Sequence, residues 1–426
     1  MKFASSMRSS SVRWAAPFVL PLTLIYYFAG ESTALDEFYG YAPALIAAPL
    51  MTLYALAYAT AAALAVWESG RLKASGIWML APARSRYRIA ANALAPTILL
   101  SWLVLILPAG LSLTRTTIFP TTGSLRLPAM AAILCVAYSV IGFGIGLKVP
   151  RLIAAPITAV VGWVAIAFSR AVQPYWVRHI SGQYTDIGFG ELPSYLSLLP
   201  PILFAGSISV AVATMWLPVR RKLFLGLLAC GLTLGGVYGA QTVAKDWNHN
   251  PPLIVGQADM TCIGNSPKVC MPQSTSSDLQ RLRNDAVSVL KDLHDADVER
   301  TPSLITDNLA DGRYQKRSTA ETWRMGLTTA ANQGDARYQF MLAAVRFPCD
   351  RVDPIAGPAV VLWAAKKTGQ AEIFERRATT QEPSPQRSQE LRQIHDIVNN
   401  VLSQSREKQA AWFYRASTQA CTGEAS

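Results

Sequence analysis

The residues in this sequence that are best suited to covalent chemistry are its six cysteines, which fall into two sets. Cys135 and Cys230 lie within apolar stretches, where a thiol packs like a small apolar side chain. The other four follow residue 243, at positions Cys262, Cys270, Cys349 and Cys421. An even number of cysteines confined to one segment is typical of disulfide bonds formed in an oxidising compartment.

The spacing of these four cysteines favours one pairing. Cys262 and Cys270 enclose the residues Ile-Gly-Asn-Ser-Pro-Lys-Val, which are typical of a turn and fit a short bridge. We therefore favour Cys262–Cys270 with Cys349–Cys421 among the three possible pairings. Four free thiols in a cytoplasmic tail remain an alternative. A zinc site is disfavoured, because no C-x₂₋₄-C spacing occurs and His249 is the only nearby imidazole.

Other residue types give no catalytic motif. His294 precedes Asp295 and Asp297, and His395 precedes Asp396, but no HExxH motif or nucleophile elbow accompanies them. We interpret these residues as solvated helix faces. The chain also lacks a Walker A motif, so it has no ATPase of its own. The sequence therefore predicts no enzyme activity, no metal and no cofactor.

Charge divides the chain into two parts, residues 1–243 and residues 244–426. The first part carries 17 Lys/Arg and 6 Asp/Glu, whereas the second carries 22 and 21. Soluble domains are about a quarter charged, so only the second part has the composition of one. The net charge of +12 comes almost entirely from short loops of the first part, which is the positive-inside pattern. It does not indicate a nucleic-acid partner.

The first part contains seven apolar runs long enough to cross a bilayer, which requires roughly 20 helical residues. We expect spans at 14–30, 42–66, 89–112, 128–147, 152–172, 195–217 and 223–243. The first run could be a signal peptide, but Tyr26, Tyr27 and Phe28 occupy the place of a small-residue cleavage site, so we expect it to stay uncleaved. The expected first domain is therefore a transmembrane domain over 1–243.

Basic residues predict the orientation of these spans. With a cytoplasmic N-terminus, the inner segments hold thirteen Lys/Arg and the outer loops hold four. That asymmetry places the protein in the cell membrane with its N-terminus inside. Because seven spans are odd in number, the domain at 244–426 is expected to be extracytoplasmic, in agreement with its cysteines.

The connection between the second and third spans, residues 67–88, is the most informative segment for function. It begins with an acidic residue and a glycine, continues as a short amphipathic stretch and ends in a turn in which arginines follow a proline. The residues that carry this pattern are Glu68, Arg71, Gly76, Ala81, Pro82, Arg84 and Arg86. The segment resembles the ATPase-coupling loop of the permease subunits of type-2 ATP-binding-cassette (ABC-2) exporters. In that family a short coupling helix in this loop docks onto the ATPase.

The resemblance extends over about residues 1–217. Residues 142–155 resemble the family's tight inner hairpin, and Gly142 and Gly146 have the small-xxx-small spacing that lets helices approach closely. Residues 174–194 resemble its short outer helices. The seventh span and the C-terminal domain are departures from the family's six-span core. The resemblance implies a homodimer or heterodimer of permease subunits in a lipid bilayer and an ATPase on another chain.

The second part reads as a small, mainly helical domain. Leu279, Leu282, Ala286, Val289, Leu290 and Leu293 repeat at helical spacing. We expect further helices near 318–332, 335–345, 356–368 and 386–418, a short strand at 253–256 and linkers at 300–312 and 378–386. The predicted fold class is thus an all-α polytopic membrane protein followed by a mainly helical, disulfide-containing domain.

Two functions fit these features. The first is a permease subunit of an ABC exporter, coupled to a separate ATPase through residues 67–88. The absence of Asp, Glu, Lys, Arg and His from the middle of the expected spans argues against a proton-coupled carrier. The alternative is a non-transport, membrane-anchored envelope protein whose extracytoplasmic domain binds a partner or ligand.

Overall fold

The chain forms two compact units in the computed structural model, Met1–Gln257 and Ala258–Ser426. The structure describes residues 10–30, 39–78, 85–184, 187–217, 222–347, 349, 351–379 and 385–421. The boundary between the two units lies after Gln257, whereas the sequence predicts a boundary after residue 243. The reason is that the extended segment after the last apolar helix pairs with the first unit, as β2 (Leu253–Ile254) lies antiparallel to β1 (Leu192–Pro193).

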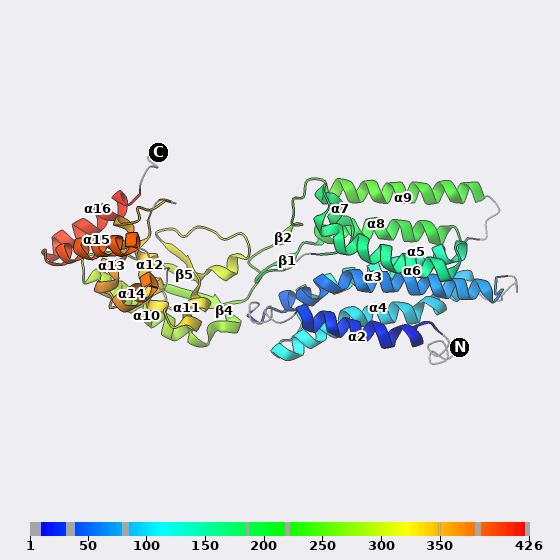
Figure 1. Ribbon diagram of the computed structural model, residues 1–426, viewed down its shortest axis with the longest axis horizontal. Helices are drawn as coiled ribbons and strands as arrows, with labels where there is room; N and C mark the ends of the chain where they lie inside the picture. The colour runs from blue at the N-terminus through cyan, green and yellow to red at the C-terminus, as the bar shows by residue number, and fades with distance from the viewer. Residues whose placement is uncertain are drawn as a thin grey trace. The chain divides into compact units, whose positions relative to one another are not determined.

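Seven described helices of the first unit are long and apolar enough to cross a membrane, and they run side by side (Figure 1). We call this part the membrane unit. Each expected span coincides with one helix to within three residues, except that α3 and α4 continue past the ends of their spans and α6 ends at Ala167, before the end of the expected span at 152–172. The helices are α2 (Val12–Gly30), α3 (Ala42–Ala74), α4 (Arg86–Thr116), α5 (Arg126–Lys148), α6 (Arg151–Ala167), α8 (Tyr195–Thr214) and α9 (Lys222–Ala244).

Helix α3 is the centre of the membrane unit and α9 lies at its periphery. α3 contacts α2, α4, α5 and α6, and its side chains are buried along most of its length. α9 packs on α8 and on α7 (Tyr175–Ile180), and most of its apolar side chains are exposed. An exposed apolar surface of this kind suits contact with lipid, because lipid chains are as apolar as the side chains themselves.

Short elements connect the helices at the end of the bundle opposite the α3–α4 connection. Between α4 and α5 lies η2 (Gly123–Leu125), and between α6 and α8 lie η3 (Phe168–Ala171), α7 and β1. The segment after α7 reaches in between the helices, where the Tyr58 hydroxyl donates to the carbonyl of Gly182 at 3.1 Å and the Gln183 amide donates to the carbonyl of Met51 at 3.2 Å.

The C-terminal unit contains a four-stranded sheet in the order β3-β4-β5-β6. Its strands are β3 (Met260–Ile263), β4 (Lys268–Pro272), β5 (Leu304–Asp307) and β6 (Thr322–Met325). β3 and β4 are antiparallel, whereas β4 pairs with β5, and β5 with β6, in parallel. Short 3₁₀ turns follow two of the strands, η4 (Gln273–Asp278) and η5 (Asn308–Asp311).

Seven helices complete the C-terminal unit in the described residues. They are α10 (Leu279–His294), α11 (Leu327–Gln333), α12 (Ala336–Val345), α13 (Ala356–Lys367), α14 (Ala371–Thr379), α15 (Pro385–Leu402) and α16 (Arg406–Gln419). The apolar face predicted for α10 is buried, which confirms its helical spacing. The core is centred on the fully buried Trp363, whose ring lies 5.2 Å from that of Phe413.

The structure corrects three expectations for this unit. The helix expected at 318–332 is strand β6 followed by the shorter α11, and the linker expected at 300–312 contains β5. The helix expected at 386–418 is two helices, since α15 ends at Leu402 and α16 starts at Arg406. The unit is thus mainly helical as predicted, but it is built on a small sheet that the sequence pattern did not reveal.

Candidate functional site at the basic end of the membrane unit

The candidate coupling residues lie at one end of the helix bundle, where α3 ends and α4 begins. α2 begins, α5 meets α6, α8 ends and α9 begins at this same end, and we call it the basic end. It collects most of the cations of the membrane unit. Those in the described residues are Arg13, Arg71, Lys73, Arg86, Arg88, Lys148, Arg151 and Lys222.

Glu68 is completely buried at the basic end. Its carboxylate accepts a hydrogen bond from the backbone N–H of Ser11 at 2.6 Å and pairs with the Arg71 guanidinium at 2.5 Å. Ser11 immediately precedes α2, so the carboxylate joins the start of α2 to the last turns of α3. A buried carboxylate is tolerated only when it is paired and hydrogen-bonded, and Glu68 meets both conditions. In this structure it holds helices together and is not exposed to a partner.

Two glycines let α5 approach α3 closely. A Cβ on Gly142 would overlap the backbone of Ala62, and one on Gly146 would overlap the Val66 carbonyl and the Ser69 side chain. The small-xxx-small spacing expected to pack helices therefore lies on the α3–α5 contact. No larger residue fits either position without moving α3.

The connection after α3 is described up to Trp78. The amphipathic stretch expected to form a coupling helix continues α3 as far as Ala74, and the described residues 67–78 contain no separate short helix. Gly76 follows the helix with φ +67°, a left-handed conformation that glycine adopts without strain. Pro82 and Arg84 lie outside the described residues. Arg86 is the first residue of α4 and is exposed.

A cavity of about 410 Å³ lies between α4, α5 and α8 at the basic end. Its wall combines apolar and aromatic side chains with two cationic ones. The lining residues include Trp78, Arg86, Phe143, Lys148, Met215 and Trp216. The Phe143 and Trp216 rings lie 5.1 Å apart, and the Tyr87 hydroxyl donates to the Ala213 carbonyl at 2.7 Å, which ties α4 to α8 beside the cavity.

The opposite end of the bundle, which we call the far end, buries its polar groups. Arg178 is 1% exposed, and its guanidinium lies 2.8 Å from Nδ1 of His249. The Nε2–H of His179 donates to the Asn248 carbonyl at 2.9 Å. Glu191 is fully buried and accepts from the Gly188 N–H at 2.7 Å. These contacts attach α7 and the segment after α9 to the bundle.

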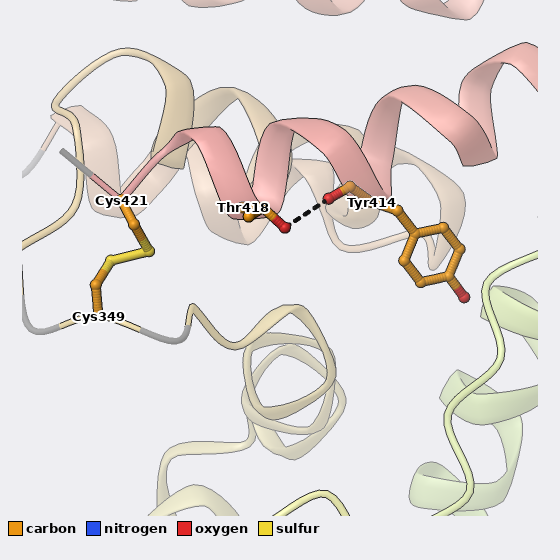
Figure 2. The surroundings of a disulfide bond; sticks show 4 residues. All are labelled: Cys349, Tyr414, Thr418 and Cys421. Atoms are coloured by element: carbon orange, nitrogen blue, oxygen red, sulfur yellow. Dashed lines mark hydrogen bonds between the residues drawn. A yellow bond between two sulfur atoms is a disulfide. The ribbon is translucent and has the colours of Figure 1, made fainter. Parts of the chain in front are cut away.

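The cysteines of the C-terminal unit are paired as the sequence favoured, Cys262 with Cys270 and Cys349 with Cys421. The first bond joins neighbouring residues of β3 and β4. The second joins the end of α16 to the loop at Cys349 (Figure 2), across 72 residues of sequence. In the same view the Thr418 hydroxyl donates to the Tyr414 carbonyl at 3.2 Å within α16. The two bonds therefore fix a strand pair and the C-terminal helix.

Asp307, at the end of β5, is the most deeply buried carboxylate among the described residues of the C-terminal unit. Burial raises the pKa of Asp307, while hydrogen bonds from the Thr328 hydroxyl at 2.6 Å and N–H at 2.7 Å oppose that rise. Asp307 therefore connects β5 to the start of α11. Among the described residues no group of three His, Cys, Asp or Glu side chains is placed to hold a metal ion.

The cavity at the basic end is the feature that sequence reasoning missed. The sequence identifies Arg86 and Lys148 as inner-loop cations and Trp78 as part of the connection, but nothing in their spacing predicts that three helices enclose a cavity. A signal was present in the aromatic residues next to those cations at the helix ends, because tryptophan and tyrosine favour the membrane interface.

Comparison with known proteins identifies only part of the chain. A family model described as a domain of unknown function (DUF7224) matches residues 269–422. The match covers β4 through α16 and so falls within the C-terminal unit. Comparisons with curated proteins and with solved structures found no match. What the chain shares with known proteins in these comparisons is therefore the C-terminal domain described as DUF7224.

Proposed function

We propose that this chain is the permease subunit of an ABC exporter, coupled to a separate cytoplasmic ATPase through residues 67–88. The proposal rests on the exposed cations at the basic end. There α3 continues beyond the buried Glu68, and Lys73, Arg86 and Arg88 are exposed on either side of the connection. A partner that docks there meets cations fixed to two long helices, so a motion of the partner is transmitted directly to α3 and α4.

Two further features support this proposal. The close contact at Gly142 and Gly146 packs the first helix of the inner hairpin, α5, directly against α3, which leads into the connection. The segment around α7 reaches into the far end between α6 and α8, at the place where the resembled family has short outer helices. The proposal includes a cytoplasmic N-terminus, an extracytoplasmic C-terminal unit and a dimer of permease subunits in the cell membrane.

Charge reversal in the connection tests the proposal. The variant Arg84→Glu with Arg86→Glu should abolish co-purification of an ABC ATPase without lowering the amount of the chain in membranes. The matched control Arg221→Glu with Lys222→Glu makes the same change of charge before α9 and should retain the ATPase. An ATPase retained by both variants contradicts coupling through residues 67–88. Because the ATPase is cytoplasmic, its loss from the first variant alone also supports the orientation.

A second candidate function rests on the family match, which covers the C-terminal unit and not the helices. In this alternative the C-terminal unit binds an envelope partner or ligand and the helices serve as its anchor. The two candidates differ in their genetic neighbourhood. A gene for an ABC ATPase next to this one favours transport, whereas its absence favours the anchored binding protein.

A further inference from the structure

The cavity at the basic end has walls of two kinds. Phe143, Trp216 and Met215 give it an apolar side, while Arg86 at the start of α4 and Lys148 at the end of α5 give it a cationic side. Met215 is 50% exposed, so the apolar side continues onto the outer surface of α8. A ligand that fills this space must be apolar at one end and anionic at the other.

Among the described residues, no acidic side chain neutralises the cations of the cavity. In the part of the chain that the structure describes, no carboxylate lies within ion-pair distance of Arg86 or Lys148. The acidic residue of the basic end, Glu68, is buried with Arg71. Arg86 also opens α4, where the first amides of a helix have no partner within the helix and the helix dipole is positive. The site therefore attracts an anion.

The indole of Trp78 also favours a ligand with hydrogen-bond acceptors. Trp78 lines the cavity, and its indole Nε1 is buried with no acceptor among the described residues. Buried donors are nearly always hydrogen-bonded, so a rotation of the indole that brings Nε1 to a ligand oxygen in the cavity would satisfy this one. Trp78 and Trp216 also lie just past the ends of α3 and α8, and tryptophan at the ends of apolar helices favours the level of lipid headgroups.

From these contacts we infer that the cavity binds the headgroup of an anionic phospholipid. The phosphate pairs with Arg86 and Lys148, a headgroup oxygen accepts from Trp78, and the acyl chains leave along Met215 into the bilayer. Zwitterionic lipid binds less well, because its own ammonium group competes with the two cations for the phosphate. This inference concerns the chain alone and does not depend on an ATPase partner.

Native mass spectrometry of the full-length chain in detergent tests this inference. Purified protein is titrated with phosphatidylglycerol and, separately, with phosphatidylcholine. Wild-type protein should retain phosphatidylglycerol preferentially. Arg86→Gln with Lys148→Gln should lower its affinity for phosphatidylglycerol by about thirtyfold, because each cation near a membrane surface contributes about fivefold.

The matched control is Lys73→Gln with Arg88→Gln, which removes the same charge at the same end from two exposed residues outside the cavity. It should leave lipid retention unchanged. An equal loss in both double variants, or no preference for phosphatidylglycerol in the wild type, overturns the inference. Displacement of the lipid by inorganic phosphate at equal concentration also overturns it, since the site would then recognise free phosphate.

A second measurement reports on position and on folding. Phosphatidylglycerol with brominated acyl chains should quench tryptophan fluorescence in wild-type protein, and Trp78→Phe with Trp216→Phe should remove the saturable part of that quenching. Quenching that is unchanged in this variant overturns the assignment to the cavity. Lys148→Gln alone separates the inference from the proposed function, because it should weaken lipid binding while ATPase co-purification stays unchanged.

Discussion

The two ends of the membrane unit use their polar residues in different ways. At the far end, Arg178 and Glu191 are almost completely buried and bonded within the chain. At the basic end, Arg86, Arg88 and Lys148 are exposed, and no ion pair is found for them among the described residues. The polar groups of the far end therefore maintain the structure, whereas those of the basic end remain available to a ligand or partner.

This difference follows from the free energy of burying charge. A charged group taken out of water costs several kcal/mol unless it is paired and hydrogen-bonded, so the far end needs nearly complete pairing. An exposed cation costs almost nothing and contributes almost nothing to stability. The basic end has structural contacts too, at Glu68 and at the glycines of α5. These contacts are buried, whereas the cations Arg86, Arg88 and Lys148 are exposed.

The largest effect is expected from Gly146→Val, which tests whether the basic end depends on close helix contact. The added side chain would overlap the backbone of Val66, so α5 must move away from α3. Overpacking of this kind costs about 3 kcal/mol or more when backbone is the obstacle. Gly110→Val is the control, because nothing lies within 4 Å of a Cβ there. Size-exclusion chromatography and thermal unfolding in detergent should show loss of folded protein for Gly146→Val only.

A smaller effect is expected from removing one cation at each end. Arg178→Gln loses the contact with His249 and leaves polar groups of the far end unpaired, which we expect to lower the free energy of unfolding by about 2 kcal/mol. Arg88→Gln at the basic end should change it by less than about 0.5 kcal/mol. Thermal unfolding followed by tryptophan fluorescence compares the two variants. Equal effects would remove the distinction drawn between the ends.

The sequence predicted the helices of the membrane unit well, for a physical reason. An apolar run of 20 residues has few alternatives to a spanning helix, because backbone groups in lipid must bond within their own segment. The cysteine pairing could also be predicted, since a turn between Cys262 and Cys270 brings these two residues together. These features depend on residues that are close in the sequence.

The strands and the cavity could not be predicted from the sequence, because they depend on residues that are far apart in it. β5 and β6 have four residues each, and they exist because they pair with each other in parallel across 18 positions. Short strands of this kind give little periodic signal. The cavity likewise requires α4, α5 and α8 to meet, and the burial of Glu68 depends on Ser11, which is 57 residues away. The spacing of residues along one segment does not predict these long-range contacts.

The smallest effect is expected for the pH dependence of stability and concerns His179 at the far end. Burial lowers the pKa of His179, and the nearby charges of Arg178 and His249 lower it further, while its bond to the Asn248 carbonyl opposes them. Because the pKa of the unfolded state is higher, unfolded protein binds the proton first, and stability falls as the pH drops below 6.5.

His179→Gln keeps a donor for the Asn248 carbonyl but cannot titrate, so its melting temperature should decline less than that of the wild type between about pH 7.5 and about pH 5.5. His294→Gln, at an exposed position of the C-terminal unit, should decline like the wild type. Parallel declines for all three proteins would mean that the far end tolerates a charge on His179. In that case tight pairing of buried charge would not distinguish the far end from the basic end at low pH.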